Sequence, residues 1–281
     1  MAVKIVTDSL SDITSDIAQG LGITVAPLTV SFGQESFLDR VTITTDEFYY
    51  RLTRDPIWPK TTQPPPGDFV NIYNKLAEET DEILVITLSS KLSGTYESAL
   101  NAKSMVKGKC RIEVIDSLTV AMGLGLIVIT AAKSAQAGAN LDQVTELVRS
   151  AMSRSHLIAY FDTLKYLAKG GRIGKAQELL GAMLLIKPIL TVKDGEMSPV
   201  TKLRTRAAGM NYLYNSATSF PHIEELAVEH ATTPDDTDKL VERLSSVFPK
   251  ERIYRSTISP VVGTYAGPSA MAVTVLEAEK K

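Results

Sequence analysis

The sequence predicts an α/β protein with two domains: a parallel-sheet, three-layer N-terminal domain and a C-terminal α/β domain with a mixed sheet. In the first half of the 281-residue chain, apolar runs alternate with amphipathic stretches, which is typical of parallel strands covered by helices. In the second half, Asp194-Gly195 separates two β-type runs and indicates an antiparallel hairpin. We place the boundary at residue 153, which gives domains 1–153 and 154–281.

The first half opens with an apolar strand at Val3–Asp8, followed by a helix at Ile13–Gly20 that Ser11 or Asp12 can cap. The other expected strands are apolar and rich in β-branched residues: Ile23–Phe32, Glu82–Leu88 and Arg111–Asp116. The other expected helices are Thr45–Arg54, Asp68–Glu79, Gly94–Val106, Thr119–Gly138 and Leu141–Ser153, of which Asp68–Glu79 places apolar residues on one face. The apolar run Val120–Ala132 is shorter than the ~20 residues that span a bilayer, so it predicts a buried helix.

The second half has a different order of elements. The expected strands are Leu157–Asp162, the hairpin pair Ile189–Val192 and Met197–Leu203, and then Leu226–His230 and Ile253–Ile258. The expected helices are one through Gln177–Leu185, then Thr205–Ser219, Asp235–Val247 and Pro268–Ala278. Pro268 suits the first turn of the last helix, because that turn does not need its N–H.

Composition and charge exclude several functional classes. The net charge is −2 with a pI near 6.0, which disfavours general binding to nucleic acids. A single cysteine, Cys110, rules out an internal disulfide, and with three histidines the chain offers few ligands for a closed zinc site. We therefore expect no metal and no cofactor. The N-terminus runs directly into a strand without a signal-peptide layout, so we expect a cytoplasmic protein.

A first candidate site is Ser89–Thr95, which follows a buried strand and opens a helix. Ligands of parallel sheets bind beyond the carboxyl ends of strands, and helix N-termini attract anions. A carboxylate or phosphate site is one interpretation, and simple N-capping by Ser93 is the other. The segment lacks the Gly-Lys-Ser/Thr of a Walker loop and is not a Gly-x-Ser-x-Gly elbow.

Two further segments offer hydroxyl groups near an expected helix start. Lys60–Pro66 contains Thr61 and Thr62 before three prolines, which predicts either a site with fixed hydroxyls or a stiff connecting loop. Val262–Ser269 follows an expected strand and is another candidate anion cradle, in which Tyr265 either donates a hydrogen bond or only packs.

Asp8-Ser9 and two basic loops complete the candidates. Asp8-Ser9 ends the first strand and is either a site or a cap. Lys169–Lys175 and Lys202–Arg206 are either solvated surface or places for an anion or an acidic partner. No motif gives a Ser-His-Asp group or an HExxH zinc site, and hydroxyls at helix starts bind anions better than they catalyse.

Taken together, these loops resemble the DegV family in order, spacing and total length, over essentially the whole chain. The residues that carry the resemblance are Thr61-Thr62-Gln63-Pro64, Ser93-Gly94-Thr95-Tyr96, Phe161-Asp162-Thr163-Leu164, Tyr166-Leu167, Gly170-Gly171-Arg172-Ile173-Gly174 and Gly263-Thr264-Tyr265-Ala266-Gly267-Pro268. The resemblance implies a two-domain α/β protein that binds one fatty acid in a tunnel between its domains. In members that serve bacterial fatty acid kinase, a separate ATP-dependent kinase subunit phosphorylates the bound carboxylate, a step that feeds phospholipid metabolism.

Carried onto this sequence, the resemblance assigns a carboxylate cradle and a partner-facing basic group. The cradle consists of Thr61, Thr62, Ser93, Gly94, Thr264 and Tyr265, and the basic group facing the partner or phosphate consists of Arg172 with Arg204 or Arg206. The sequence departs from the family at Tyr265, where members usually have histidine, and at Ser269, where they usually have glycine. A histidine can carry a positive charge beside a carboxylate, whereas a tyrosine hydroxyl donates as a neutral group, so the departure bears on phosphate transfer.

The leading hypothesis is a carrier, not itself an enzyme, that binds a long-chain fatty acid and presents its carboxylate to a kinase subunit. Transient contact with a membrane surface is compatible with that role. Apolar residues expected in the tunnel are Leu28, Ile86, Phe161, Leu164 and Ile189, although core packing explains them equally well. The alternatives are a stand-alone enzyme acting on a phosphorylated or acyl substrate, and a DNA-linked regulator, which the acidic pI disfavours.

Overall fold

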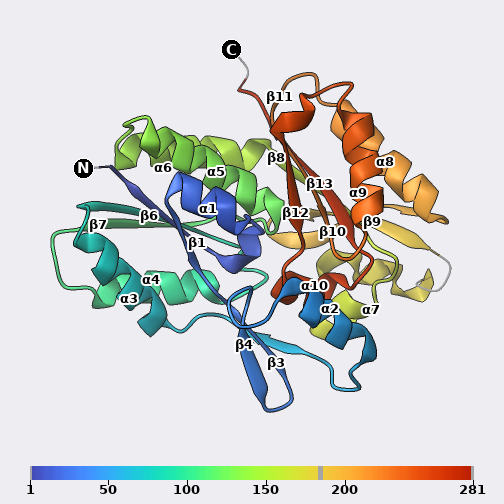
Figure 1. Cartoon of the computed structure of the whole chain (residues 1–281), viewed down its shortest axis with the longest axis horizontal. Coiled ribbons are helices and arrows are strands. Elements are labelled where there is room, and N and C mark those ends of the chain that lie inside the picture. Colours follow the sequence, from blue (N-terminus) through green and yellow to red (C-terminus); the bar gives the residue numbers. More distant parts are fainter. Residues whose placement is uncertain (1, 183–185, 280–281) are drawn as a thin grey trace.

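A computed structural model describes residues 2–182 and 186–279 and shows an α/β fold with a parallel and a mixed sheet (Figure 1). The parallel sheet has the strand order β2-β1-β6-β7, and each neighbouring pair in it runs parallel. Its strands are β1 (Lys4–Asp8), β2 (Ile23–Ala26), β6 (Glu82–Thr87) and β7 (Arg111–Asp116). The predicted parallel half is therefore confirmed.

Helices cover both faces of the parallel sheet and give it three layers. On one face, Ile83 and Val85 of β6 pack with Phe69 in a core that α3 (Pro66–Ala77) and α4 (Thr95–Met105) complete. On the other face, Leu84 and Ile86 belong to the largest core. That core includes residues of α5 (Met122–Gln136) and α6 (Leu141–Arg154), with α1 (Ser15–Leu21) packed against it. Both faces of β6 are buried, as its continuous apolar run indicates.

The mixed sheet has six strands in the order β10-β9-β8-β13-β11-β12, of which only β11 and β12 pair in parallel in the described ranges. Helices α8 (Arg206–Thr218) and α9 (Pro234–Leu244) cover one face, and α5 contacts β8, β11 and β13. Because α5 also contacts β1 and β6, one helix packs on both sheets. The strands are β8 (Ser155–Tyr160), β9 (Lys187–Lys193), β10 (Glu196–Leu203), β11 (Ile223–His230), β12 (Ile253–Thr257) and β13 (Met271–Glu277).

A small antiparallel sheet, β4-β3-β5, projects below the parallel sheet in Figure 1. Helix α10 (Pro260–Ala266) contacts two of its strands as well as α2 (Thr45–Arg54) and α7 (Lys165–Gly170). The strands are β3 (Thr29–Phe32), β4 (Glu35–Leu38) and β5 (Lys60–Thr62). Short 3-10 helices are η1 (Ser9–Ser11), η2 (Gly174–Ala182) and η3 (Lys250–Arg252).

Two predictions for the first half are wrong. The expected strand Ile23–Phe32 is two strands in different sheets, because Pro27 lacks an N–H and the chain leaves the parallel sheet there. The segment Lys60–Pro66 is not wholly a connecting loop, since Lys60–Thr62 forms the edge strand β5 beside β3. Prolines mark the end of that strand and the start of α3, where Pro66 occupies the first turn.

The expected helix Pro268–Ala278 is also wrong. Most of this segment is β13, which is paired on both sides by β8 and β11 and buried along nearly its whole length. The helix lies earlier, at Pro260–Ala266, where Pro260 occupies the first turn and Ser259 caps it. The helix expected through Gln177–Leu185 begins as the 3-10 helix η2, and residues 183–185 lie outside the described residues.

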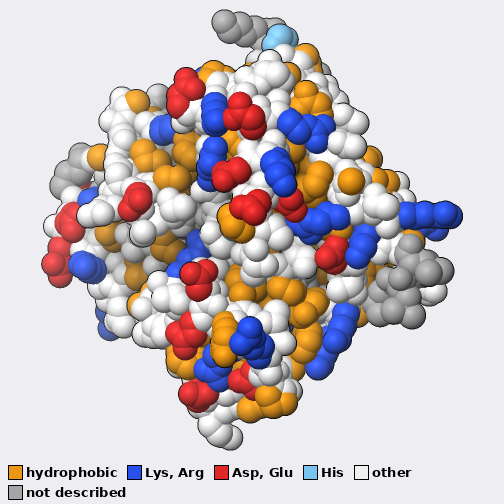
Figure 2. Space-filling view, turned by 45° about the vertical axis from the view of Figure 1, so that its right-hand side comes forward, with side chains coloured by type: hydrophobic (Ala, Val, Ile, Leu, Met, Phe, Trp, Pro, Cys, Tyr) orange, Lys and Arg blue, Asp and Glu red, His pale blue; other side chains and the backbone are white. Residues whose placement is uncertain are grey.

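The apolar run predicted to be a buried helix is confirmed as α5, whose residues Met122–Ala132 are all buried. Among the helices in residues 2–182 and 186–279, none combines the length and the apolar character needed to cross a membrane. On the face shown in Figure 2, basic and acidic side chains are interspersed, as the net charge of −2 suggests. That face therefore does not present a broad field of one sign.

A fully buried aspartate ties the first part of the chain to the corner between β12 and α10. Asp12 Oδ1 accepts a hydrogen bond from Ser259 N at 3.1 Å and lies 3.3 Å from Arg40 Nη2. Its backbone oxygen accepts the hydroxyl of Ser256, and the Arg40 guanidinium also donates to the carbonyl of Thr257. Because Ser259 caps α10, these bonds fix where that helix begins.

We predict opposite effects on stability for two glycines in helices. A Cβ on Gly125 in α5 would lie 2.4 Å from the backbone oxygen of Ser11, whereas a Cβ on Gly20 in α1 meets nothing within 4 Å. Gly125→Ala should lower the free energy of unfolding by roughly 1–3 kcal/mol through overpacking. Gly20→Ala should raise it by roughly 0.4–1 kcal/mol. Urea unfolding measures both, and a Gly125→Ala variant as stable as wild type would contradict the close approach of α5 to η1.

The buried carboxyls make stability depend on pH. Burial raises the pKa of Asp39 to about 7, although Arg40 and the bond from Ser9 oppose this shift. An unfolded aspartate has a pKa of roughly 3.9, so between these values the folded protein holds more protons and its stability falls as pH rises. One such group contributes at most about 1.4 kcal/mol per pH unit. The free energy of unfolding is measured at a series of pH values from 4 to 8. As the pH rises over this range, Asp39→Asn should therefore lose less stability than the wild type. Parallel plots of unfolding free energy against pH for the two proteins would refute this assignment.

Candidate ligand-binding site

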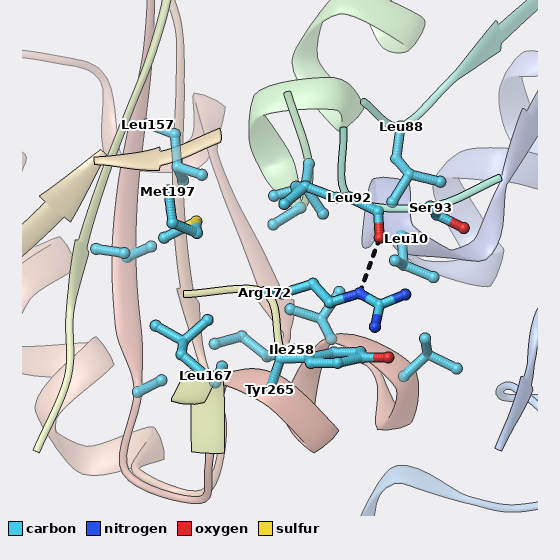
Figure 3. A pocket seen from close by; sticks show the side chains of 18 of the residues that line it. Leu10, Leu88, Leu92, Ser93, Leu157, Leu167, Arg172, Met197, Ile258 and Tyr265 are labelled. Carbon is cyan, nitrogen blue, oxygen red and sulfur yellow. Dashed lines mark hydrogen bonds between the residues drawn. The ribbon is translucent and has the colours of Figure 1, made fainter. Parts of the chain in front are cut away.

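A pocket lies between the loops at the carboxyl edge of the parallel sheet and one face of the mixed sheet (Figure 3). It contains about 860 Å³ of space not filled by protein atoms, counting its open mouth. Residues from both halves of the chain form its wall, including Leu10, Leu28 and Leu88 from the first half and Leu157, Met197 and Ile258 from the second.

Most of the pocket wall is apolar, and small side chains on the mixed sheet leave the space open. Ala159 of β8 pairs directly with Ala272 of β13, and both line the pocket. Leu157 and Phe161 line it as well, since alternate residues of a strand face the same side. Of the tunnel residues expected from the sequence, Leu28 and Phe161 line the pocket, whereas Ile86, Leu164 and Ile189 are buried elsewhere in the core.

Hydroxyl groups gather at one end of the pocket. The Thr61 hydroxyl, on β5, and the Tyr265 hydroxyl, on α10, form a hydrogen bond of 2.5 Å across 204 positions of sequence. Ser93 also lines this end, with its hydroxyl 2.9 Å from that of Thr95. Gly94 is the N-cap of α4 and no side chain caps that end, so Ser93 does not serve as the cap. The first amides of α4 thus remain available to an anion.

Arg172 lies beside these hydroxyls and is largely exposed. Its Nε donates to the carbonyl of Leu92 at 3.1 Å, and its Nη1 donates to Gly170 O at 3.0 Å. The guanidinium lies 5.3 Å from the centre of the Tyr265 ring. Figure 3 shows it extending between Ser93 and Tyr265. The structure therefore places a positive charge at the polar end of the pocket, held there by two backbone carbonyls.

Other residues expected in the cradle lie outside the pocket wall. The side chain of Thr62 is exposed, as expected for the neighbour of Thr61 on a strand. Thr264 is buried, and its hydroxyl donates to Pro260 O within α10 at 3.1 Å. Gly94 lies against Gln63, since a Cβ there would approach the Gln63 side-chain nitrogen at 3.0 Å. The structure thus brings together Thr61, Ser93 and Tyr265, with Gly94 at the adjoining helix start.

The two remaining arginines differ in their surroundings. Arg206 is held by the carboxylate of Asp236 at 2.7 Å and by the carbonyl of Ser269 at 3.1 Å, and its guanidinium lies over Tyr160. Arg204 is exposed and precedes α8. Neither is part of the described pocket wall, so Arg172 is the arginine that the structure places at the pocket.

Asp8 and Ser9 fit the interpretation as caps. Asp8 accepts hydrogen bonds from Leu10 N at 3.0 Å and Leu88 N at 2.8 Å, and Ser9 donates to Asp39 at 2.7 Å. Burial raises the pKa of Asp8 to about 7, although the hydrogen bonds from the backbone amides of Leu10 and Leu88 act to lower it. The bond from Leu88 N to Asp8 joins the carboxyl end of β1 to that of β6, next to the pocket.

The pocket wall also contains an acidic residue that the candidate motifs of the sequence did not include. Glu229, on β11, is 1% exposed and lines the pocket, and burial raises its pKa well above the usual range. Its signal in the sequence is an acidic residue at an inward position of the apolar strand Leu226–His230. Residues 2–182 and 186–279 contain no group of three or more His, Cys, Asp or Glu side chains placed to hold a metal ion.

Comparison with known proteins supports a single family. A family model described as "Uncharacterised protein, DegV family" matches residues 2–278. A DegV domain-containing protein of Caldanaerobacter subterraneus is 38% identical over 275 residues, which cover 96% of this chain and 97% of that protein. A DegV domain-containing protein of Clostridium perfringens is 35% identical over 279 residues, which cover 97% and 98%.

Solved structures with the same fold include proteins that bind fatty acids. A fatty-acid-binding DegV family protein from Thermus thermophilus has a TM-score of 0.91 at 28% identity, covering 99% of this chain and 100% of that one. DegV, a fatty-acid-binding protein from Bacillus subtilis, has a TM-score of 0.90 at 28% identity with the same coverage. A stearic-acid-binding protein from Eubacterium ventriosum has a TM-score of 0.86 at 25% identity, covering 98% of each chain. From the match over residues 2–278 and the identity with full-length relatives, this chain belongs to the DegV family.

Proposed function

We propose that this protein binds one long-chain fatty acid in the described pocket, with the carboxylate at the polar end and the hydrocarbon chain along the apolar wall. The observation that carries the proposal is the separation of the wall into an apolar length and one end rich in hydroxyls. Each buried CH₂ group contributes about 0.8 kcal/mol, so a long chain binds tightly there. The fatty-acid-binding relatives with the same fold support this ligand class.

The carboxylate is held by neutral donors together with a helix start. Thr61, Ser93 and Tyr265 supply hydroxyls, and the N-terminus of α4 at Gly94 supplies amides and a partial positive charge. The Thr61 and Tyr265 hydroxyls are already hydrogen-bonded to each other. A carboxylate placed beside the pair accepts from both once this mutual bond is exchanged for bonds to the anion.

The finer part of the proposal is that the protein is a carrier which presents the carboxylate to a separate ATP-dependent kinase subunit. Arg172 supports this role, because it is exposed beside the polar end and can pair with phosphate or with an acidic partner. We further propose two domains, 1–153 and 154–281, with the pocket as the tunnel between them. The last residue of α6 is Arg154, and β8 of the mixed sheet begins at Ser155. We also propose that the carrier works in the cytoplasm and makes transient contact with a membrane surface.

Extraction of the purified protein under denaturing conditions, followed by mass spectrometry of the released small molecules, tests the ligand class. A fatty acid at about one per chain is the expected result. Protein that is empty and also fails to take up added fatty acids contradicts the proposal. Turnover of an acyl or phosphorylated substrate by the chain alone would instead support a stand-alone enzyme.

We predict that the hydroxyls at the polar end contribute directly to affinity. Thr61→Val and Ser93→Ala should each weaken binding of a fatty acid by about tenfold or more, since a hydrogen bond to a charged group contributes roughly 1.5–3 kcal/mol. Thr62→Val, next to Thr61 but exposed, is the matched control and should stay within about twofold of wild type, because replacing an exposed group changes little. Competition with a fluorescent fatty acid measures all three, and equal affinities in Thr61→Val and Thr62→Val would remove Thr61 from the cradle.

A second prediction concerns the partner. With a DegV-dependent kinase subunit and ATP, Arg172→Ala should lower the rate of acyl phosphate formation at least tenfold more than it lowers fatty acid affinity. Arg111→Ala, which removes an exposed arginine paired with Asp142, is the control and should leave both unchanged. Equal losses of rate and affinity in Arg172→Ala would show that this arginine only helps to retain the lipid.

A further inference from the structure

The pocket wall contains a carboxyl group in a row where strands β8 and β13 present only methyl groups. Across the mixed sheet, strand pairing aligns Ala159, Ala272, Glu229 and Ser256 in one row. Ala159, Ala272 and Glu229 all line the pocket, and Glu229 is 1% exposed. A hydrocarbon chain lying over the two alanines therefore has the Glu229 carboxyl at its side.

Hydrogen bonds decide which form of this carboxyl faces the pocket. Glu229 Oε2 accepts from Met122 N at 3.3 Å, and the Glu229 and Asp12 carboxyls interact directly. Asp12 Oδ2 is buried and receives no hydrogen bond in the described part of the chain, so a proton on Glu229 would give it the donor that it lacks. Arg40 and Ser259 N both favour a charged Asp12, which leaves the proton on Glu229.

This proton fixes the hydrogen-bonding character of the wall. Glu229 uses its one proton on Asp12 and one oxygen lone pair on Met122 N, so what it offers to the pocket is acceptor capacity. A plain hydrocarbon chain leaves this acceptor unpaired. A hydroxyl on the chain pairs with it, whereas a keto group, which is itself an acceptor, does not.

We propose that Glu229 forms a hydrogen-bond-accepting subsite in the apolar wall, which selects long-chain fatty acids that carry a hydroxyl group along the chain. The inference rests on the proposed function, because it assumes that an acyl chain occupies the pocket. The subsite is distinct from the carboxylate cradle, since Glu229 lies on β11 whereas Thr61, Ser93 and Tyr265 lie on β5, before α4 and on α10. It adds a second polar requirement to an otherwise apolar pocket.

Delipidated protein is titrated with stearic acid, with monohydroxystearic acids that differ in hydroxyl position, and with the matching oxostearic acids. The expected result is one hydroxyl position that binds about tenfold more tightly than stearic acid, while the oxo acid of the same position shows no gain. Hydroxyls at other positions should bind more weakly than stearic acid, because they are buried against hydrocarbon.

Variants assign the effect to Glu229. Glu229→Gln keeps both a donor for Asp12 and an acceptor for the chain, so the preference persists. Glu229→Met keeps the length but removes the acceptor, so the preference disappears. Glu225→Gln is the matched control on the same strand, because Glu225 is buried at 6% exposure, pairs with Lys133 and lies outside the described pocket wall.

Each outcome decides between the two proposals. If stearic and hydroxystearic acids bind equally, or if Glu229→Met retains the preference, the subsite is refuted and fatty acid binding stands. If hydroxy and oxo acids gain equally, the wall is polar without being a selective acceptor, and the inference is wrong. If no acid binds, the proposed function itself fails and the subsite falls with it. Where Glu229→Met does not fold, the hydroxy and oxo series on wild type decides the question.

Discussion

The buried carboxyl of Asp12 is the contact on which the shape of the pocket depends. It lies just after β1, yet its partners Arg40, Ser259 and Glu229 come from a loop before α2, from the start of α10 and from β11. Burial raises its pKa to about 6, while Arg40 and the bonds from Ser259 favour the charged form. Removing a charge from water is costly unless hydrogen-bonding or charged partners surround it. The segment after β1 and the corner between β12 and α10 must therefore stay close together. The pocket occupies the space beside this contact.

Helix α10 connects the Asp12 contact to the polar end of the pocket. Its first residues are fixed through Ser259, and its last turn presents Tyr265 to Thr61 on the edge strand β5. Gly170 allows the approach, since a Cβ there would lie 2.3 Å from the Tyr265 ring. A site made of hydroxyls from β5, α10 and the start of α4 is thus assembled by packing between elements distant in sequence. The same packing leaves Ala159 and Ala272 facing empty space instead of a neighbouring side chain.

The polar end of the pocket is built from groups that bind anions. Neutral hydroxyls and helix amides stabilise a carboxylate without supplying a base or a nucleophile of raised reactivity. Arg172 adds a positive charge, which the carbonyls of Leu92 and Gly170 hold at the exposed mouth of the pocket. Glu229 adds a neutral acid in the wall, because an ionised one would lose its hydration there and be repelled by the charge of Asp12. In the proposed complex the carboxylate lies at the mouth, the hydrocarbon chain lies along the apolar wall, and Glu229 lies beside the chain.

The sequence by itself determined the fold class, because the alternation of apolar strands with amphipathic helices and the Asp194-Gly195 hairpin are local patterns that require no partner. It also indicated Thr61, Ser93, Arg172 and Tyr265, since each lies close to glycines or prolines, which mark breaks between helices and strands where side chains are free to meet ligands. Only the tertiary structure decided that residues 271–277 form a strand, because that apolar run is stabilised as a strand by pairing with β8 and β11. The tertiary structure likewise decided that Thr61 faces the pocket whereas Thr62 is exposed, and that Arg206 pairs with Asp236. It also placed Glu229 beside Asp12. Those outcomes depend on which distant backbone lies alongside each residue, and local sequence patterns carry no information about that.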